Sequence, residues 1–149
     1  MDLNYKKSNQ ILKVDIQISE NAKLYIKVLM NSYEEWDRQK FGEALLDELS
    51  DSAGIDIVKL KISSAKQFHK RSGNKIIIKQ YGYYRPKENY IYIHNRTAVQ
   101  GKILASKTFL DTLLHEWLHH YDYKKLGLNS IHSAGFYSRL NHLKEMLEI

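Results

Sequence analysis

The spacing of hydrophobic residues predicts a chain that begins with a strand and continues with helices. In residues 12–18, hydrophobic and polar side chains alternate, which is the two-residue period of a half-buried strand; the hydrophobic positions are Leu12, Val14, Ile16 and Ile18. From residue 19 to about residue 52 the hydrophobic positions recur at helical intervals, and no proline interrupts them. We expect one long helix or two shorter ones, broken near Asn31 and Ser32, with Gly54 beyond the end.

Three further segments, residues 55–62, 75–80 and 89–94, are predicted strands. The first alternates again, and the other two are rich in isoleucine and tyrosine. The segment that joins the last two, residues 81–87, contains a glycine and the only proline of the chain, which is typical of a hairpin-like turn. We therefore expect strands 75–80 and 89–94 to pair with each other.

The C-terminal part of the chain predicts two helices. In residues 108–126 the hydrophobic side chains have helical spacing, and Gly127 is well placed to end the helix. Residues 133–149 repeat this spacing, with Ser133 as the expected N-cap. The order of elements predicts an α+β fold with N-terminal helices and a small, mostly antiparallel sheet. With 149 residues and no internal repeat, we expect residues 1–149 to form a single domain.

The amino-acid composition limits which metal ligands, nucleophiles and binding partners are possible, and it says less about the fold. The chain has no cysteine, which excludes disulfides, thiolate zinc sites and a cysteine nucleophile, so any metal must be bound by His, Asp or Glu. Residues 1–10 are polar, no apolar stretch follows them, and no segment has the length of a membrane-spanning helix. We expect a cytoplasmic protein without a membrane partner. The net charge of +6 favours polyanions such as nucleic acid, but the lysines are dispersed, and solvated surfaces explain them equally well.

One motif within the helix of residues 108–126 indicates a reaction. The sequence His115-Glu116-Trp117-Leu118-His119 is an HExxH motif. Two histidines four residues apart project from one face of a helix and can bind the same zinc ion. The residue after the first ligand, Glu116, can accept a proton from a metal-bound water, whose pKa the metal lowers.

A catalytic zinc ion usually has three protein ligands, so the motif requires a third ligand downstream. We choose His132, because the helix can end near Gly127 and return the chain to the metal. The rival donors are Asp122, which we expect instead to hold a ligand imidazole in place, and Asp111, Glu145 and Glu148. His120 points about 100° away from His119 and is a poor ligand for the same ion. We expect surface exposure or support of a ligand for His120, and we expect His69, His94 and His142 to be solvated or hydrogen-bonded residues that bind no metal. Zn²⁺ is the expected cofactor, although cobalt, nickel or iron would fit the same donors.

The residues from Thr112 to His120, followed by His132 to Phe136 and by Arg139-Leu140, resemble the SprT-like zinc metalloproteases, a family that includes the Spartan-type DNA–protein crosslink proteases. In that family a third histidine follows the helix and is itself followed, four residues later, by phenylalanine. The resemblance implies a minimal, gluzincin-like zincin core and peptidase activity on proteins held on DNA. Many relatives carry a cysteine-rich zinc ribbon, whereas this chain has no cysteine. The resemblance also implies that a strand at residues 89–94 forms the upper edge of a cleft and pairs with an extended peptide.

Three functions remain open from the sequence. The first is a zinc metallopeptidase with a protein or peptide substrate and DNA as a candidate partner. The second is a basic nucleic-acid-binding module with a zincin-like fold and no peptidase activity, for which the tyrosines near residues 81–92 could stack nucleobases or simply pack a sheet. The third is a zinc hydrolase acting on a small amide or a cell-wall peptide. Candidates for stabilising an oxyanion are Tyr137, Tyr121 and Arg139.

Overall fold

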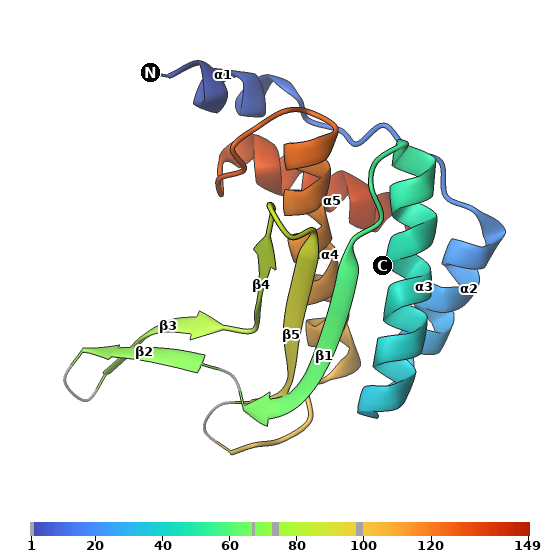
Figure 1. Cartoon of the computed structure of the whole chain (residues 1–149), viewed down its shortest axis with the longest axis vertical. Coiled ribbons are helices and arrows are strands. Elements are labelled where there is room, and N and C mark those ends of the chain that lie inside the picture. The colour runs from blue at the N-terminus through green and yellow to red at the C-terminus, as the bar shows by residue number, and fades with distance from the viewer. Residues whose placement is uncertain (1, 67, 73–74, 98–99) are drawn as a thin grey trace.

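The computed structural model describes residues 2–66, 68–72, 75–97 and 100–149. Helices and strands follow in the order α1 (Leu3–Gln10), α2 (Glu20–Met30), α3 (Glu35–Ala53), β1 (Lys59–Lys66), β2 (Phe68–Ser72), β3 (Lys75–Gln80), β4 (Gly82–Arg85), β5 (Tyr90–Arg96), α4 (Ser106–Lys124) and α5 (Ala134–Met146) (Figure 1). The fold is α+β, as predicted. Among the helices described, none has the length and apolar character that crossing a membrane requires.

The helices predicted from periodicity are confirmed, with ends that differ from the predicted ones by up to three residues. The helical segment after residue 19 is broken between α2 and α3, and α3 ends at Gly54, which has a positive φ of 70°. Gly127 follows α4 with a φ of 65°. The side chain of Ser133 caps α5 by accepting a hydrogen bond from the backbone N–H of Phe136. Helix α1 was not predicted, because its residues are mostly polar and give no hydrophobic period.

The predicted strand at residues 12–18 is wrong, although its pattern of burial is right. Val14 and Ile16 are buried, yet this extended segment pairs with no strand in the described part of the chain. Its backbone N–H groups donate instead to side chains: Val14 to Nδ1 of His142, Asp15 to the hydroxyl of Tyr121, and Gln17 to the hydroxyl of Ser52. Alternation therefore indicated burial on one side of an extended chain, but it could not identify what the backbone pairs with.

The sheet differs from the predicted one in its pairing. Strands lie in the order β1-β5-β4, with β1 parallel and β4 antiparallel to β5, so this sheet is mixed rather than mostly antiparallel. Strand β3 pairs with β2 in a separate hairpin, which extends away from the sheet (Figure 1), and not with β5 as expected. Residues 81–87, which were predicted to form a turn, contain strand β4. The glycine and the proline do not interrupt this strand, because Gly82 is its first residue and Pro86 follows its last.

Helices α3 and α4 cover one face of the β1-β5-β4 sheet. Helix α3 packs against β1, and α4 packs against β4 and β5. The inward side chains Leu60, Ile62, Ile91 and Ile93 are buried in one hydrophobic cluster with residues from α2, α3, α4 and α5. Trp117 of α4 is fully buried and donates from its indole nitrogen to Ser50 of α3. The core thus fixes the orientation of α4.

Helix α1 is fastened to the segment between α4 and α5. The side chain of Asn4 both accepts from and donates to the backbone of Asn129, the hydroxyls of Ser8 and Ser133 are 2.7 Å apart, and Asn9 accepts from the backbone N–H of Gly135. A Cβ atom at Gly135 would overlap the backbone of Ser8 and would come within 2.8 Å of Asn9 Cα. Glycine is therefore required at this position if α1 is to lie so close to α5.

We predict that Gly135→Ala detaches or displaces α1. Overpacking against backbone atoms should lower the free energy of unfolding by about 1–3 kcal/mol. Urea-induced unfolding measures the loss, and limited proteolysis should show faster cleavage around residue 10.

Ser138→Ala is the matched control, because this partly exposed residue of the same helix should change stability by less than about 0.5 kcal/mol. A Gly135→Ala protein with the stability and protease resistance of the Ser138→Ala protein would show that the close approach of α1 is not needed.

Candidate metal centre

Helix α4 presents His115 and His119 because its other face is fixed in the core. Leu113, Trp117 and Leu118 are fully buried, whereas the two histidines are partly exposed on the cleft side. Their rings are 5.0 Å apart between centroids, one helical turn apart along the axis. The arrangement predicted from the i, i+4 spacing is present.

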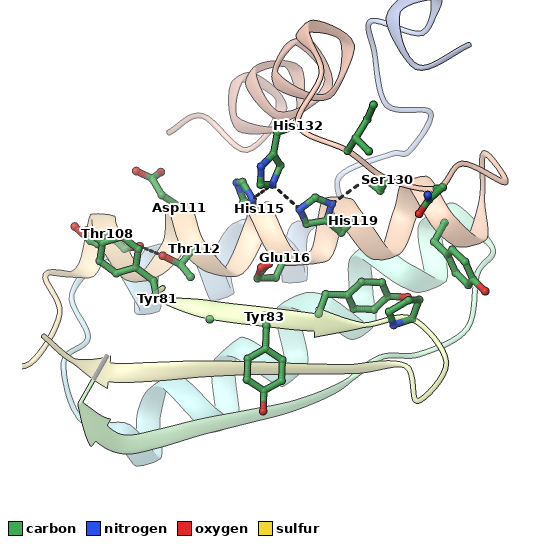
Figure 2. Close-up of a pocket in the computed structure, with 16 residues that line it drawn as sticks. Tyr81, Tyr83, Thr108, Asp111, Thr112, His115, Glu116, His119, Ser130 and His132 are labelled. Atoms are coloured by element: carbon green, nitrogen blue, oxygen red, sulfur yellow. Dashed lines mark hydrogen bonds between the residues drawn. The ribbon is translucent and has the colours of Figure 1, made fainter. Parts of the chain in front are cut away.

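The third histidine meets this pair from the segment that follows α4. Nε2 of His132 lies 3.0 Å from Nε2 of His115 and 3.0 Å from Nε2 of His119, as the dashed lines in Figure 2 show. Among the described residues, these histidines form a group whose possible ligand atoms all lie within 4.8 Å of one another. That group includes neither Glu145 nor Glu148, the rival third ligands. The structure thus brings together the three residues chosen from the sequence.

The aromatic ring of Phe136 supports all three imidazoles. Its centroid lies 4.6 Å from His119 in a stacked arrangement, 5.0 Å from His115 and 5.4 Å from His132. Phe136 is fully buried at the first turn of α5. A rigid apolar surface therefore limits the rotation of the three rings and shields one side of them from water.

Ser130 determines which nitrogen of His119 is available to a metal. The serine hydroxyl donates its single hydrogen to Oδ2 of Asp122 at 3.0 Å, and Nδ1 of His119 is 2.8 Å from the same hydroxyl oxygen. The oxygen must then accept from Nδ1–H of His119, which leaves an unprotonated Nε2 directed at His132. Asp122 thus supports a ligand imidazole as expected, but through Ser130, which the sequence interpretation missed.

Asp122 is held by a buried ion pair with Arg139. The guanidinium donates from Nε to Oδ1 at 3.0 Å and from Nη2 to Oδ2 at 2.7 Å, and both side chains are fully buried. Nη1 of Arg139 also donates to the carbonyl oxygens of Ser8 and Ile11, at 2.6 Å each. Burial raises the pKa of Asp122, and the hydrogen bonds from Arg139 and Ser130 oppose that shift. This pair connects α4, α5 and the N-terminal helix.

The protonation states of the site suit a metal. Burial lowers the pKa of His115 to about 4 and that of His119 to about 3, and the neighbouring imidazoles act in the same direction. Both rings are therefore neutral at neutral pH, as metal ligands must be. Burial also raises the pKa of Glu116 to about 7. Glu116 is buried, with 7% of the residue exposed, and its side chain lies between α4 and β4, beside the histidines (Figure 2).

His120 is fully buried and positions the edge of the cleft, so the expectation of surface exposure is wrong. Its Nε2 donates to the carbonyl oxygen of Asp56 at 2.7 Å, and its Nδ1 therefore accepts from the hydroxyl of Tyr84 at 2.8 Å. Burial lowers the pKa of His120 and keeps it neutral. The bond to Tyr84 ties strand β4 to helix α4, and the bond to Asp56 ties the segment before β1 to the same helix.

An open cleft of about 1090 Å³ lies between α4, strand β4 and the segment before α5. Its lining includes His115, Glu116, His119 and His132, together with Tyr81, Tyr84 and Tyr123. The strand that borders the cleft is β4, the edge strand of the sheet, whereas β5 lies in the middle. The expectation that residues 89–94 form the cleft edge is therefore corrected to residues 82–85. Tyr123 was not singled out from the sequence.

The remaining candidates have other contacts. Asp111 is paired with Lys144 at 2.8 Å on the rim of the cleft. The hydroxyl of Tyr121 accepts from the backbone of Asp15, and this residue and Arg139 are both buried, whereas Tyr137 is 46% exposed with its ring 6.0 Å from His132. His142 accepts from Val14, and His94 packs edge-on against Tyr92. The side chain of His69 lies outside the described residues.

Comparison with family models, with curated proteins and with solved structures gives no match. The geometry of the site indicates its class. Three imidazoles whose Nε2 atoms lie close together can hold a metal ion. For metal–nitrogen bonds of about 2.0–2.1 Å in a tetrahedral site, nitrogen atoms are roughly 3.3 Å apart, close to the 3.0 Å that separates Nε2 of His132 from Nε2 of His115 and of His119. These donors suit zinc and also other late transition metals.

We predict that Ser130→Ala weakens metal binding. Without the hydroxyl, His119 loses the acceptor that fixes its tautomer, and such supporting contacts are typically worth about 10- to 100-fold in affinity. Competition with a chromophoric chelator measures the dissociation constant of zinc. Ser138→Ala serves as the control and should bind zinc as the unmodified protein does; equal affinities for the two variants would contradict the role assigned to Ser130.

We also predict that the two cations of α5 differ sharply in their contribution to stability. Arg139→Met leaves the Asp122 carboxylate buried without its partner and should cost about 3–5 kcal/mol. Lys144→Met removes the partner of a half-exposed carboxylate and should cost less than about 1 kcal/mol. Urea-induced unfolding of both variants checks the contrast, and similar losses would show that the Asp122 pair is not the stronger constraint.

Proposed function

We propose that this protein is a zinc-dependent metallopeptidase with a zincin-like, SprT-like core. One observation carries the proposal: three imidazole nitrogens converge beside a buried carboxyl group, inside an open cleft that an edge strand borders. The order of these parts along the chain agrees with the resemblance to the SprT-like family, since the HExxH helix is followed by His132 and Phe136.

In this proposal His115, His119 and His132 hold the zinc ion. When bound, zinc supplies a Lewis acid that polarises the substrate carbonyl and lowers the pKa of a water molecule. The chain prepares for the ion by keeping two of the rings neutral and by fixing the tautomer of His119 through Ser130. Phe136 excludes water from the apolar side of the rings.

Glu116 is the proposed general base. Its carboxylate accepts a proton from the attacking water and then delivers that proton to the leaving amine of the cleaved peptide bond. Its location supports this role, because the side chain lies next to the histidines yet is not one of the ligand group. Burial of the residue restricts the range of orientations that the carboxyl group can adopt.

Strand β4 is the proposed contact for the substrate backbone. It pairs with β5 on one side, and the cleft lies along β4 beneath α4. An extended peptide could add to this edge through main-chain hydrogen bonds, which gives binding with little dependence on sequence. The size of the cleft supports a polypeptide rather than a small amide as substrate. Proteins associated with DNA are the substrate class that the family resemblance suggests.

The decisive experiment compares two glutamate variants. Glu116→Gln should retain one zinc ion per chain and lose roughly 100- to 10,000-fold in the rate of hydrolysis, because the amide cannot accept the proton of water. Zinc content is measured by elemental analysis, and cleavage is followed on an unfolded protein such as casein, with and without single-stranded DNA.

Glu145→Gln is the matched control, since this exposed residue was a rival ligand and lies outside the ligand group. It should retain both zinc and activity. Cleavage by Glu116→Gln at the unmodified rate would exclude Glu116 as the base. Zinc binding without cleavage of any protein, combined with salt-sensitive DNA binding, would favour the alternative of a nucleic-acid-binding module with no peptidase activity.

A further inference from the structure

The face of the β1-β5-β4 sheet that points away from the helices carries aromatic side chains. Along β5, Ile91 and Ile93 are fully buried on the side of the sheet that α4 covers, while the alternating residues Tyr90, Tyr92 and His94 are partly exposed on the opposite side. Helices of the described chain that contact these strands pack on the isoleucine side. We call the opposite side the outer sheet face.

The neighbouring strands extend this face in register. Tyr92 lies between Lys61 of β1 and Tyr83 of β4, and Tyr90 lies between Lys59 of β1 and Arg85 of β4. Figure 2 shows the ring of Tyr83 on the side of β4 that points away from α4. Each of these two rows therefore places a lysine at one edge of the sheet and a tyrosine at its centre.

The rings of the outer sheet face are ordered against one another. Tyr83 and Tyr92 stack with centroids 5.2 Å apart and planes inclined by 4°, and His94 meets Tyr92 edge-on at 5.0 Å. The guanidinium carbon of Arg85 is 5.0 Å from the centroid of Tyr83. These contacts hold the side chains in fixed positions, so binding a flat ligand on them costs little conformational entropy.

The charge of this face has one sign. Strands β1, β4 and β5 contain no Asp or Glu. Lys59, Lys61 and Arg85 are exposed, and the ion pairs found among the described residues involve none of the three. Three cations around an aromatic centre thus lack acidic partners of their own and are available to a negatively charged ligand.

We propose that the outer sheet face binds single-stranded nucleic acid. Rings and the Arg85 guanidinium offer planes on which unpaired bases stack, and the lysines lie where a phosphate backbone would cross the sheet. A duplex fits less well, because its bases are already stacked on one another. An acidic polypeptide would use the cations but gain little from stacked tyrosines. The inference does not depend on peptidase activity, since the outer sheet face and the metal group share no side chain.

The test measures binding of a fluorescently labelled oligo(dT) of about 15 nucleotides by fluorescence anisotropy. Tyr92→Ala should weaken binding by roughly 5- to 150-fold, and Tyr92→Phe, which retains the ring, should bind as the unmodified protein does. Lys61→Ala should reduce the slope of log affinity against log salt concentration by about 0.7, as expected for one lost phosphate contact with a single strand.

Two controls match these variants on other surfaces. Lys27→Ala removes one exposed lysine of α2, and Tyr33→Ala removes a tyrosine that is 62% exposed. Both should bind the oligonucleotide as the unmodified protein does. Circular dichroism and zinc content show that every variant is folded with its metal site retained, which separates this test from that of the proposed peptidase activity.

Three outcomes would overturn the proposal. The first is no detectable binding at about 50 mM salt, where phosphate contacts are strong. The second is an equal effect of the outer-face variants and of the controls, which would indicate non-specific attraction to a basic protein. The third is a duplex or a polyglutamate chain that binds as tightly as oligo(dT), which would assign the face to that partner.

Discussion

The buried ion pair between Asp122 and Arg139 is the interaction on which the geometry of the candidate metal centre depends. Its two fully buried charges can remain inside the protein only because they neutralise each other and fill their remaining hydrogen-bonding capacity with Ser130 and the carbonyl groups of Ser8 and Ile11. Those extra bonds fix the segment that carries His132 relative to α4. Burying a charge away from water costs free energy. The hydrogen bonds that offset this cost for Asp122 and Arg139 also orient the metal centre.

Much of the fold could be predicted because the buried and exposed sides of a helix are visible in the spacing of its own hydrophobic residues. The periodicity of α2, α3, α4 and α5 arises from residues close in sequence, and the glycines at 54 and 127 and the cap at 133 mark ends locally. Strand pairing is not local. Residues 12–18 alternate as β5 does, yet their partners are side chains from three helices, and a tyrosine-rich segment with glycine and proline became strand β4. The alternation of hydrophobic and polar residues does not identify the segment with which an extended backbone forms hydrogen bonds.

In the candidate site, too, the features set by neighbouring residues could be predicted, whereas the contacts between remote segments could not. His115, Glu116 and His119 follow from a helical period, and His132 with Phe136 follows from the family resemblance and from the need for a third ligand. Ser130 gave no signal, because a serine in a connecting segment is common and its importance comes from its two partners in space. The structural use of His120 was also hidden, since its partners Asp56 and Tyr84 lie in remote segments. Spacing identifies groups on one element, whereas contacts between elements require the structure.

The attachment of α1 has a consequence for how the protein is made. The hydrogen bond between Ser8 and Ser133 joins residues 125 positions apart, and that between Arg139 and Ser8 joins residues 131 positions apart. During synthesis from the N-terminus, α1 must wait for nearly every later element before it finds its partners. The segment with His132 therefore acquires its final position only after α5 has been synthesised, so the third imidazole is the last of the three to be fixed in place.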